Sequence, residues 1–180
     1  ALVELMAGSD ESDPKLWTDL PNNGDGSVFN SSRSILINST DIRKSNSAAM
    51  YLSMVSYALN DNAIVTNTSQ ADTIYTSVES LFLGQGFAAS SSAGPFETYL
   101  VRGMGGSPMV MIYEAQFIEE FTREPSAITS DMVLMYPQPT LFTQHTYVAL
   151  SDKGREVGEL LSSDAELQRL AAEYGLRTTD

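Results

Sequence analysis

The chain has 180 residues, a length that fits one domain, and its 42% hydrophobic and 18% charged residues describe a globular protein with enough apolar side chains for a core. The net charge of −13 argues against nucleic acid and against an anionic membrane surface as partners. The absence of cysteine excludes disulfides, thiolate metal sites and thiol catalysis. No apolar run approaches the length of a membrane helix, and the N-terminus lacks the basic and apolar parts of a signal peptide.

Residues 1–33 are rich in Gly, Pro, Asn, Ser and acidic residues, which predicts an irregular N-terminal segment. The run "SILIN" (34–38) then has the β-branched, apolar character of a short buried strand. Apolar residues spaced by three and four predict a helix over 46–59, which "NDN" should end. A weaker strand follows at 63–66, and a second helix is predicted over 71–86.

A serine run then leads into a helix that should begin at Pro95. The most strand-like run, "PMVMIYE" (108–114), is followed directly by a helical pattern over 115–124. Two more strands are predicted at 131–137 and 146–151. Two helices, 153–163 and 164–175, close the chain, the second capped by Asp164 and ended by Gly175.

Strands that alternate with helices indicate an α/β fold, with a mostly parallel sheet flanked by helices. We therefore expect one α/β domain over residues 34–180. In such folds, ligands bind at the carboxyl ends of the strands, where loops lead into helix N-termini.

Three loops have that position and are rich in polar groups. A helix N-terminus offers unpaired N–H groups and a partial positive charge, to which side-chain hydroxyls add further donors. Helix capping by one such side chain is the simpler interpretation of each loop taken alone. The candidate ligand-binding residues in the three loops are Thr40, Asp41, Ser45, Asn46, Ser47, Ser91, Ser92, Tyr113 and Glu114.

Other patterns are weaker. A Ser–His–Asp hydrolase can be written with Ser91, His145 and Asp131, but no nucleophile-elbow motif surrounds the serine. The glycine-rich "GMGGS" (103–107) precedes a predicted strand, which is the wrong order for a phosphate-binding loop. We expect no catalysis, no metal and no cofactor.

Several segments resemble the later part of bacterial extracellular solute-binding proteins of the type II periplasmic-binding-protein superfamily. They are "STDIRKSNSAAMYL", "SSSAGPFETYL", "MVMIYEAQFI", "LMYPQPTLFTQHTYVAL" and "ELQRLAAEYGLR", and the resemblance runs from about residue 17 to the C-terminus. Complete members are longer, so the chain is expected to correspond to a C-terminal portion, one lobe plus returning hinge segments.

The resemblance implies two α/β lobes with a small solute held in the cleft between them. It places Thr40, Ser45, Asn46 and Ser47 at a cleft-facing helix start, with Ser91 and Ser92 in a neighbouring loop. Tyr113 and Glu114 would approach the hinge, and the chain would return through it near 131–140.

The implied role is extracytoplasmic binding, periplasmic or extracellular, in partnership with a transporter permease or a fused sensor domain. The solute could be an oxyanion held by N–H dipoles, or a neutral or cationic molecule with Glu114 as the counter-charge. A protein–protein interaction module without a small ligand is the alternative.

Overall fold

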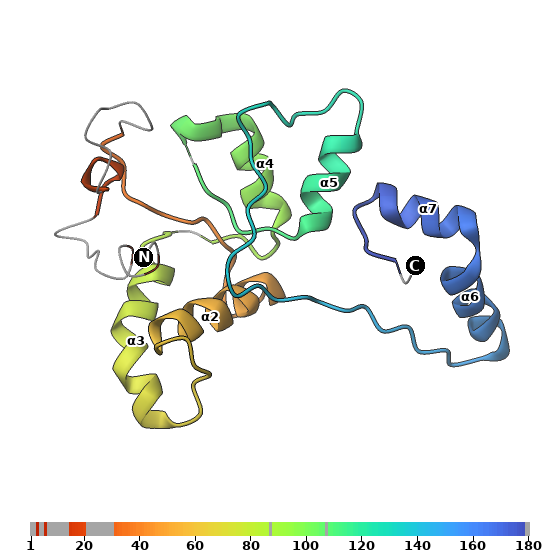
Figure 1. Cartoon of the computed structure of the whole chain (residues 1–180), viewed down its shortest axis with the longest axis horizontal. Coiled ribbons are helices and arrows are strands. Elements are labelled where there is room, and N and C mark those ends of the chain that lie inside the picture. The colour runs from red at the N-terminus through yellow and green to blue at the C-terminus, as the bar shows by residue number, and fades with distance from the viewer. Residues whose placement is uncertain are drawn as a thin grey trace. The chain divides into compact units, whose positions relative to one another are not determined.

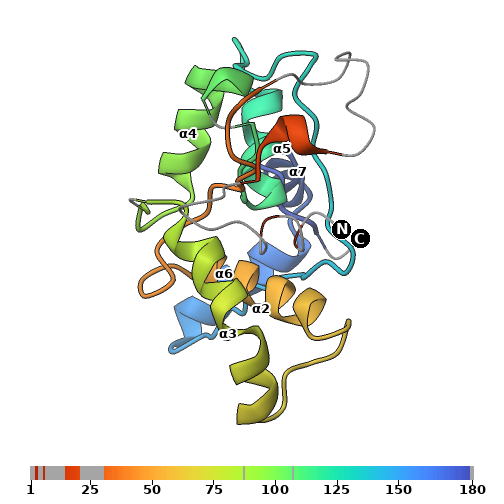
Figure 2. The same cartoon turned by 90° about the vertical axis from the view of Figure 1, so that its left-hand side faces the viewer.

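A computed structural model describes residues 3, 6, 15–20, 31–86, 88–106 and 108–178 (Figures 1 and 2). The chain forms two compact units, Ala1–Met111 and Ile112–Asp180, and each is described here by itself. The first unit contains the short 3₁₀ helices η1 (Trp17–Asp19) and η2 (Gly103–Gly105) and the α-helices α2 (Asn46–Leu59), α3 (Thr68–Leu83) and α4 (Ala93–Arg102). The second contains α5 (Glu114–Thr122), α6 (Asp152–Ser163) and α7 (Ala165–Glu173).

The helices agree with the apolar spacing of the sequence. In α2, the buried residues Ala48, Tyr51 and Val55 recur at spacings of three and four, so they share one face. The helix ends at Asn60, and the next two residues, Asp61 and Asn62, have φ values of 53° and 58°. Asp and Asn tolerate this left-handed conformation better than most residues, so the predicted stop is confirmed.

The hydrophobic core lies in the first unit. Met6, Ile35, Tyr51, Val55 and Leu81 form its buried cluster. Helices α2 and α3 contact each other, and the rings of Tyr51 and Phe82 lie 5.5 Å apart between them. Every side chain in the described residues that is both hydrophobic and buried belongs to this unit.

The α/β fold predicted for residues 34–180 is wrong. The structure is 50% helix and 4% strand, and its described residues form no sheet. Among the described residues, strand-like contacts consist of three isolated bridges: the antiparallel Leu16↔Ser34 and the parallel Asn38↔Val110 and Thr40↔Ala89. A sheet needs a continuous ladder of backbone hydrogen bonds, and each of these contacts is one residue pair long.

The runs predicted as strands over 131–137 and 146–151 do not form strands in the described structure. No backbone–backbone hydrogen bond joins residues 133–150 to another described residue. β-Branched and apolar residues favour an extended backbone, but they do not supply a neighbouring strand. Pro137 and Pro139 also remove two donors from this stretch.

In the second unit, α7 packs on α5 through a glycine. Gly175 has a φ of 74°, and a Cβ there would lie 2.6 Å from Ala115 Cα. The Thr122 hydroxyl, at the end of α5, donates to the Glu173 carbonyl at 3.1 Å. Helices α6 and α7 form a hairpin that Figure 1 shows in blue.

In the part of the chain that the structure describes, each helix is too short or too polar to cross a membrane.

Candidate functional site

The loop before α2 is a tight turn built on one aspartate. The Asp41 carboxylate accepts hydrogen bonds from the backbone N–H, Nε and Nη2 of Arg43 at 2.8–3.0 Å. These bonds, those of the Arg43 side chain first, hold the pKa of Asp41 at about 2, below its ordinary 3.8. The Asp41 carbonyl also accepts from the N–H groups of Lys44 and Ser45. Asp41 thus shapes the turn and partly neutralises Arg43.

Three hydroxyls form a hydrogen-bonded chain at the start of α2. Thr40 Oγ1 lies 2.7 Å from Ser47 Oγ, which lies 2.9 Å from Ser45 Oγ. Thr40 and Ser47 are buried, at 0% and 5% exposure, whereas Ser45 is half-buried. The two inner hydroxyls therefore orient Ser45. The neighbouring Asn46 is exposed, as are Ile42, Arg43 and Lys44 earlier in the loop.

These hydroxyls do not cap the helix. Ser45 is the N-cap residue of α2, but its side chain makes no cap hydrogen bond. By contrast, the side chains of Asn67, Ser151 and Asp164 accept backbone N–H bonds at the starts of α3, α6 and α7. The simpler interpretation of the loop before α2, helix capping by Ser45, therefore does not hold.

The second predicted loop lies beside the first. Thr40 bridges Ala89 in parallel, and the Asp41 N–H donates to the Ala89 carbonyl at 2.8 Å. The exposed Ser90 and Ser91 and the buried Ser92 follow Ala89 and lead into α4. Because the two strand-like segments run parallel, the loops that follow them leave from the same end.

A third strand-like segment, around Val110, contacts the segment that contains Asn38 and Thr40. Asn38 bridges Val110 in parallel: its N–H donates to the Met109 carbonyl, and its carbonyl accepts from the Met111 N–H at 2.8 Å. The predicted site residues Tyr113 and Glu114 come after this segment but belong to the second unit.

Glu114 is already engaged inside its own unit. Its carboxylate forms a two-point ion pair with Arg177, with Nε–Oε2 at 2.8 Å and Nη2–Oε1 at 2.9 Å, and it accepts the Tyr136 hydroxyl. These bonds, Arg177 first, lower the pKa of Glu114. The Arg177 guanidinium also lies 5.4 Å from the Phe142 ring centre. A cationic solute at Glu114 would have to displace Arg177.

Tyr113 precedes α5, and its N–H donates to Gln116 Oε1 at 3.1 Å.

Sequence reasoning missed two polar residues. Gln85 accepts the Ser39 N–H at 2.6 Å through Oε1 and donates to the Leu81 carbonyl, so it links α3 to the strand-like segment before the hydroxyl chain. Glu120 is 8% exposed, accepts the Ala127 N–H and pairs with Arg123 at 3.1 Å. No sequence signal distinguishes the half-buried Gln85 and the buried Glu120 from the exposed Gln and Glu of the chain.

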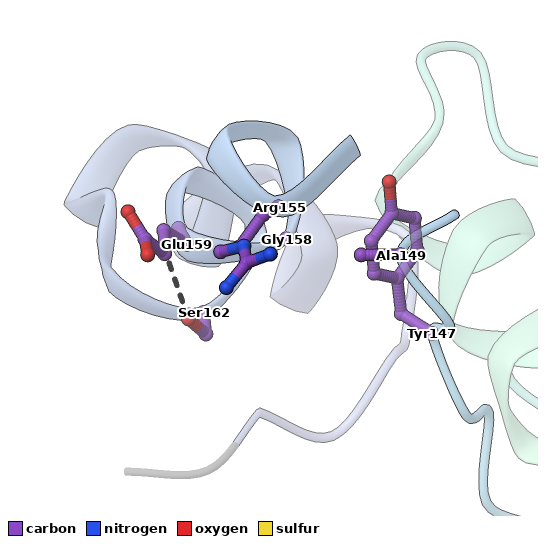
Figure 3. A pocket seen from close by; sticks show the side chains of 6 residues that line it. All are labelled: Tyr147, Ala149, Arg155, Gly158, Glu159 and Ser162. Carbon is purple, nitrogen blue, oxygen red and sulfur yellow. Dashed lines mark hydrogen bonds between the residues drawn. The ribbon is translucent and has the colours of Figure 1, made fainter. Parts of the chain in front are cut away.

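The second unit has a shallow surface depression of about 330 Å³ (Figure 3). The Tyr147 ring packs against α6, where a Cβ at Gly158 would lie 2.9 Å from Tyr147 Cε1, and the Tyr147 hydroxyl donates to the Gly154 carbonyl. Arg155 and Glu159 border the depression from α6. Its geometry is explained by the packing of the tyrosine on the helix, so we assign it no ligand.

In the described residues, Ser91, His145 and Asp131 do not form a hydrogen-bonded triad. Asp131 accepts the hydroxyl of Thr129, and within the described residues no hydrogen bond joins it to the exposed His145. Ser91 and His145 belong to different units. Over the described ranges, no group of three or more His, Asp or Glu side chains is placed to hold a metal ion.

No protein-family model matches the chain, and neither a curated protein nor a solved structure shows significant similarity to it.

Proposed function

We propose that this chain is an extracytoplasmic solute-binding domain, periplasmic or extracellular, and that it binds a small polar solute at the loops before α2 and α4. It acts by binding alone, without catalysis or a cofactor, and serves a transporter permease or a fused sensor domain. The proposal concerns the role of the two loops and requires no sheet.

The observation that carries the proposal is the parallel contact between Thr40 and Ala89. It brings two hydroxyl-rich loops, far apart in sequence, to neighbouring helix starts. A single capped helix would not need this arrangement, and the start of α2 does not use Ser45 as a cap. The resemblance of the same segments to extracellular solute-binding proteins is the second support.

The solute would contact the half-buried Ser45 and the exposed Asn46 and Ser91, while Thr40 and Ser47 hold Ser45 in place. The N-terminal N–H groups of the 14-residue α2 favour a ligand oxygen with negative or partial negative charge. An oxyanion or a carboxylate- or hydroxyl-bearing solute suits such donors.

The test is a thermal-shift screen of sulfate, phosphate, simple sugars and amino acids, followed by calorimetric titration of any compound that stabilises the chain. Ser45→Ala should weaken binding about tenfold, because it removes one directed hydrogen bond from the bound state. Ser53→Ala is the matched control, since Ser53 is on the same helix and its hydroxyl bonds the Ala49 carbonyl. Equal affinity of the Ser45 and Ser53 variants would contradict the proposal.

A further inference from the structure

Gln85 lies in a turn between two glycines at the end of α3. The Gly84 N–H closes the last turn of the helix on the Ser80 carbonyl, and Gly86 has a φ of 68°, which glycine adopts without strain. The Gln85 Nε2 donates to the Leu81 carbonyl at 3.2 Å, one of the helix-end carbonyls that have no partner within an α-helix. This bond fixes the amide to α3 and leaves Oε1, its acceptor atom, for a partner outside the helix.

That partner is the backbone of Ser39, whose N–H donates to Gln85 Oε1 at 2.6 Å. Ser39 is 4% exposed, so its N–H is shielded from solvent and needs an acceptor within the protein. The Ser39 hydroxyl has no hydrogen-bond partner among the described residues. The hydrogen bond to Gln85 is therefore the contact that holds the polar groups of Ser39 in place.

The next residue, Thr40, begins the chain of hydroxyls at the proposed solute site. Thr40 is fully buried, and its Oγ1 lies 2.7 Å from Ser47 Oγ. On the other side of Thr40, the Asp41 N–H donates to the Ala89 carbonyl at 2.8 Å. The segment that begins with Gln85 thus binds the residues before and after Thr40, the first through a side chain and the second through the backbone.

We propose that Gln85 is a positioning residue of the solute site. By accepting the Ser39 N–H it fixes Thr40, and with Thr40 the hydroxyl chain that orients Ser45. Without this acceptor, a buried N–H would lose its partner, and the backbone at Thr40 would shift to find another. The inference rests on the proposed function and adds to the site a residue that neither of its two loops contains.

Gln70 provides a matched control on the same helix. Its Oε1 also accepts a backbone N–H, that of Thr66 at 2.8 Å, and both glutamines are half-buried. The Gln70 bond joins residues four apart and involves neither loop of the site. Methionine has a similar length and no amide, so Gln85→Met and Gln70→Met remove the same kind of bond near opposite ends of α3.

The first measurement needs no solute. Thr40→Val and Ser47→Ala each remove one partner of the same hydrogen bond, so their effects on the unfolding equilibrium constant should be non-additive by about fivefold. This coupling should persist in the Gln70→Met chain and disappear in the Gln85→Met chain, because Thr40 has moved. If Gln85 only stabilised the fold, its loss would lower stability and leave the coupling unchanged. Persistence of the coupling in Gln85→Met overturns the proposal.

The wild-type chain supplies a second readout, which holds even where Gln85→Met does not fold. The Ser39 amide should exchange slowly with solvent hydrogen, because its N–H is buried and bonded to Gln85. Fast exchange at Ser39, in a chain whose α2 amides are protected, overturns the proposal.

The link to binding is tested by calorimetric titration of sulfate, phosphate, glucose and glycine into the wild-type chain and the two methionine variants. Each probe that binds the wild-type chain should bind about tenfold more weakly to Gln85→Met and equally well to Gln70→Met. Equal binding by all three chains overturns the role of Gln85 and leaves the solute site intact. Binding of none of the probes by the wild-type chain contradicts the proposed function instead, and the coupling of Thr40 to Ser47 still tests the role of Gln85.

Discussion

The Ser45 hydroxyl lies 2.9 Å from the Ser47 hydroxyl and makes no hydrogen bond to the backbone of the helix that it precedes. An ordinary N-cap hydroxyl accepts a hydrogen bond from a backbone N–H of its helix, whereas the Ser45 hydroxyl is bonded to the Ser47 hydroxyl instead. Its energetic consequence can be measured with the chain alone.

Ser45 and Ser47 should be energetically coupled. Ser45→Ala should lower the free energy of unfolding by about 1 kcal/mol in the wild-type chain and by clearly less in a Ser47→Ala background, because the lost hydrogen bond is already absent there. Denaturant unfolding of the four chains measures the coupling. If the two effects simply add, the hydroxyls do not interact. Asn67→Ala, which removes a true cap of α3, calibrates the scale at about 1 kcal/mol.

Tyr51 carries a buried hydroxyl without a hydrogen-bond partner among the described residues. Burial raises its pKa to about 12, since the charged form is poorly solvated in the core. Tyr51→Phe should raise the free energy of unfolding by about 1 kcal/mol, because it removes an unsatisfied polar group and keeps the ring. Thermal unfolding should show this gain in stability for Tyr51→Phe. The control Tyr75→Phe, at an exposed position on α3, should not gain stability. A loss of stability in Tyr51→Phe would mean that the hydroxyl is hydrogen-bonded.

Gly175 is required where α7 ends against α5. Gly175→Ala should lower stability by about 2–4 kcal/mol, because it adds left-handed backbone strain and forces a methyl group against Ala115. Hydrogen exchange of α5 and α7 amides reports the loss of their packing. Gly105→Ala is the control, since a Cβ at Gly105 meets nothing within 4 Å. Similar behaviour of the two variants would refute the close contact.

The Glu114–Arg177 pair should make the C-terminal segment sensitive to acid. The pKa of Glu114 is lowered from its ordinary 4.5 by the Arg177 and Tyr136 hydrogen bonds. The stability that this carboxylate contributes is therefore fully present above pH 4.5 and is lost as pH falls through the lowered value. Exchange of the amides of 174–178 should accelerate over that range in the wild-type chain.

In Arg177→Gln, the same amides should exchange rapidly at neutral pH and change little on acidification. An unchanged acid response in this variant would assign the pH dependence to other groups. Asp41, with a pKa of about 2, lies in the first unit, so hydrogen exchange of the amides of 41–47 measures its titration separately.

The helices could be predicted from the sequence because helix formation depends on residues close together in the chain. The spacing of Ala48, Tyr51 and Val55, the cap at Asp164 and the left-handed Gly175 each depend on neighbours within a few residues. The sequence did not show that the predicted strands lack sheet partners in the described structure, because strand pairing depends on segments distant in the chain. "DMVLMYP" and "TYVAL" have the composition of strands, yet the described chain gives them no neighbour.

The candidate site divides in the same way. Three loops were predicted to line one site, and the Thr40–Ala89 contact places those before α2 and α4 side by side. A ligand site shared by them stays a prediction. The sequence did not indicate that Thr40 and Ser47 would be buried, or that Arg177, 63 residues away, would occupy Glu114. Tertiary packing determines which polar side chains are buried and which distant side chains form ion pairs. The spacing of polar residues along the sequence does not predict either.

The most direct test of solute binding is backbone amide chemical-shift mapping during titration of the compound that most stabilises the chain. Amides of residues 40–47 and 89–92 should shift together along one saturation curve, because both loops contact the same molecule. Shifts confined to one loop, or located elsewhere, would contradict a shared binding site.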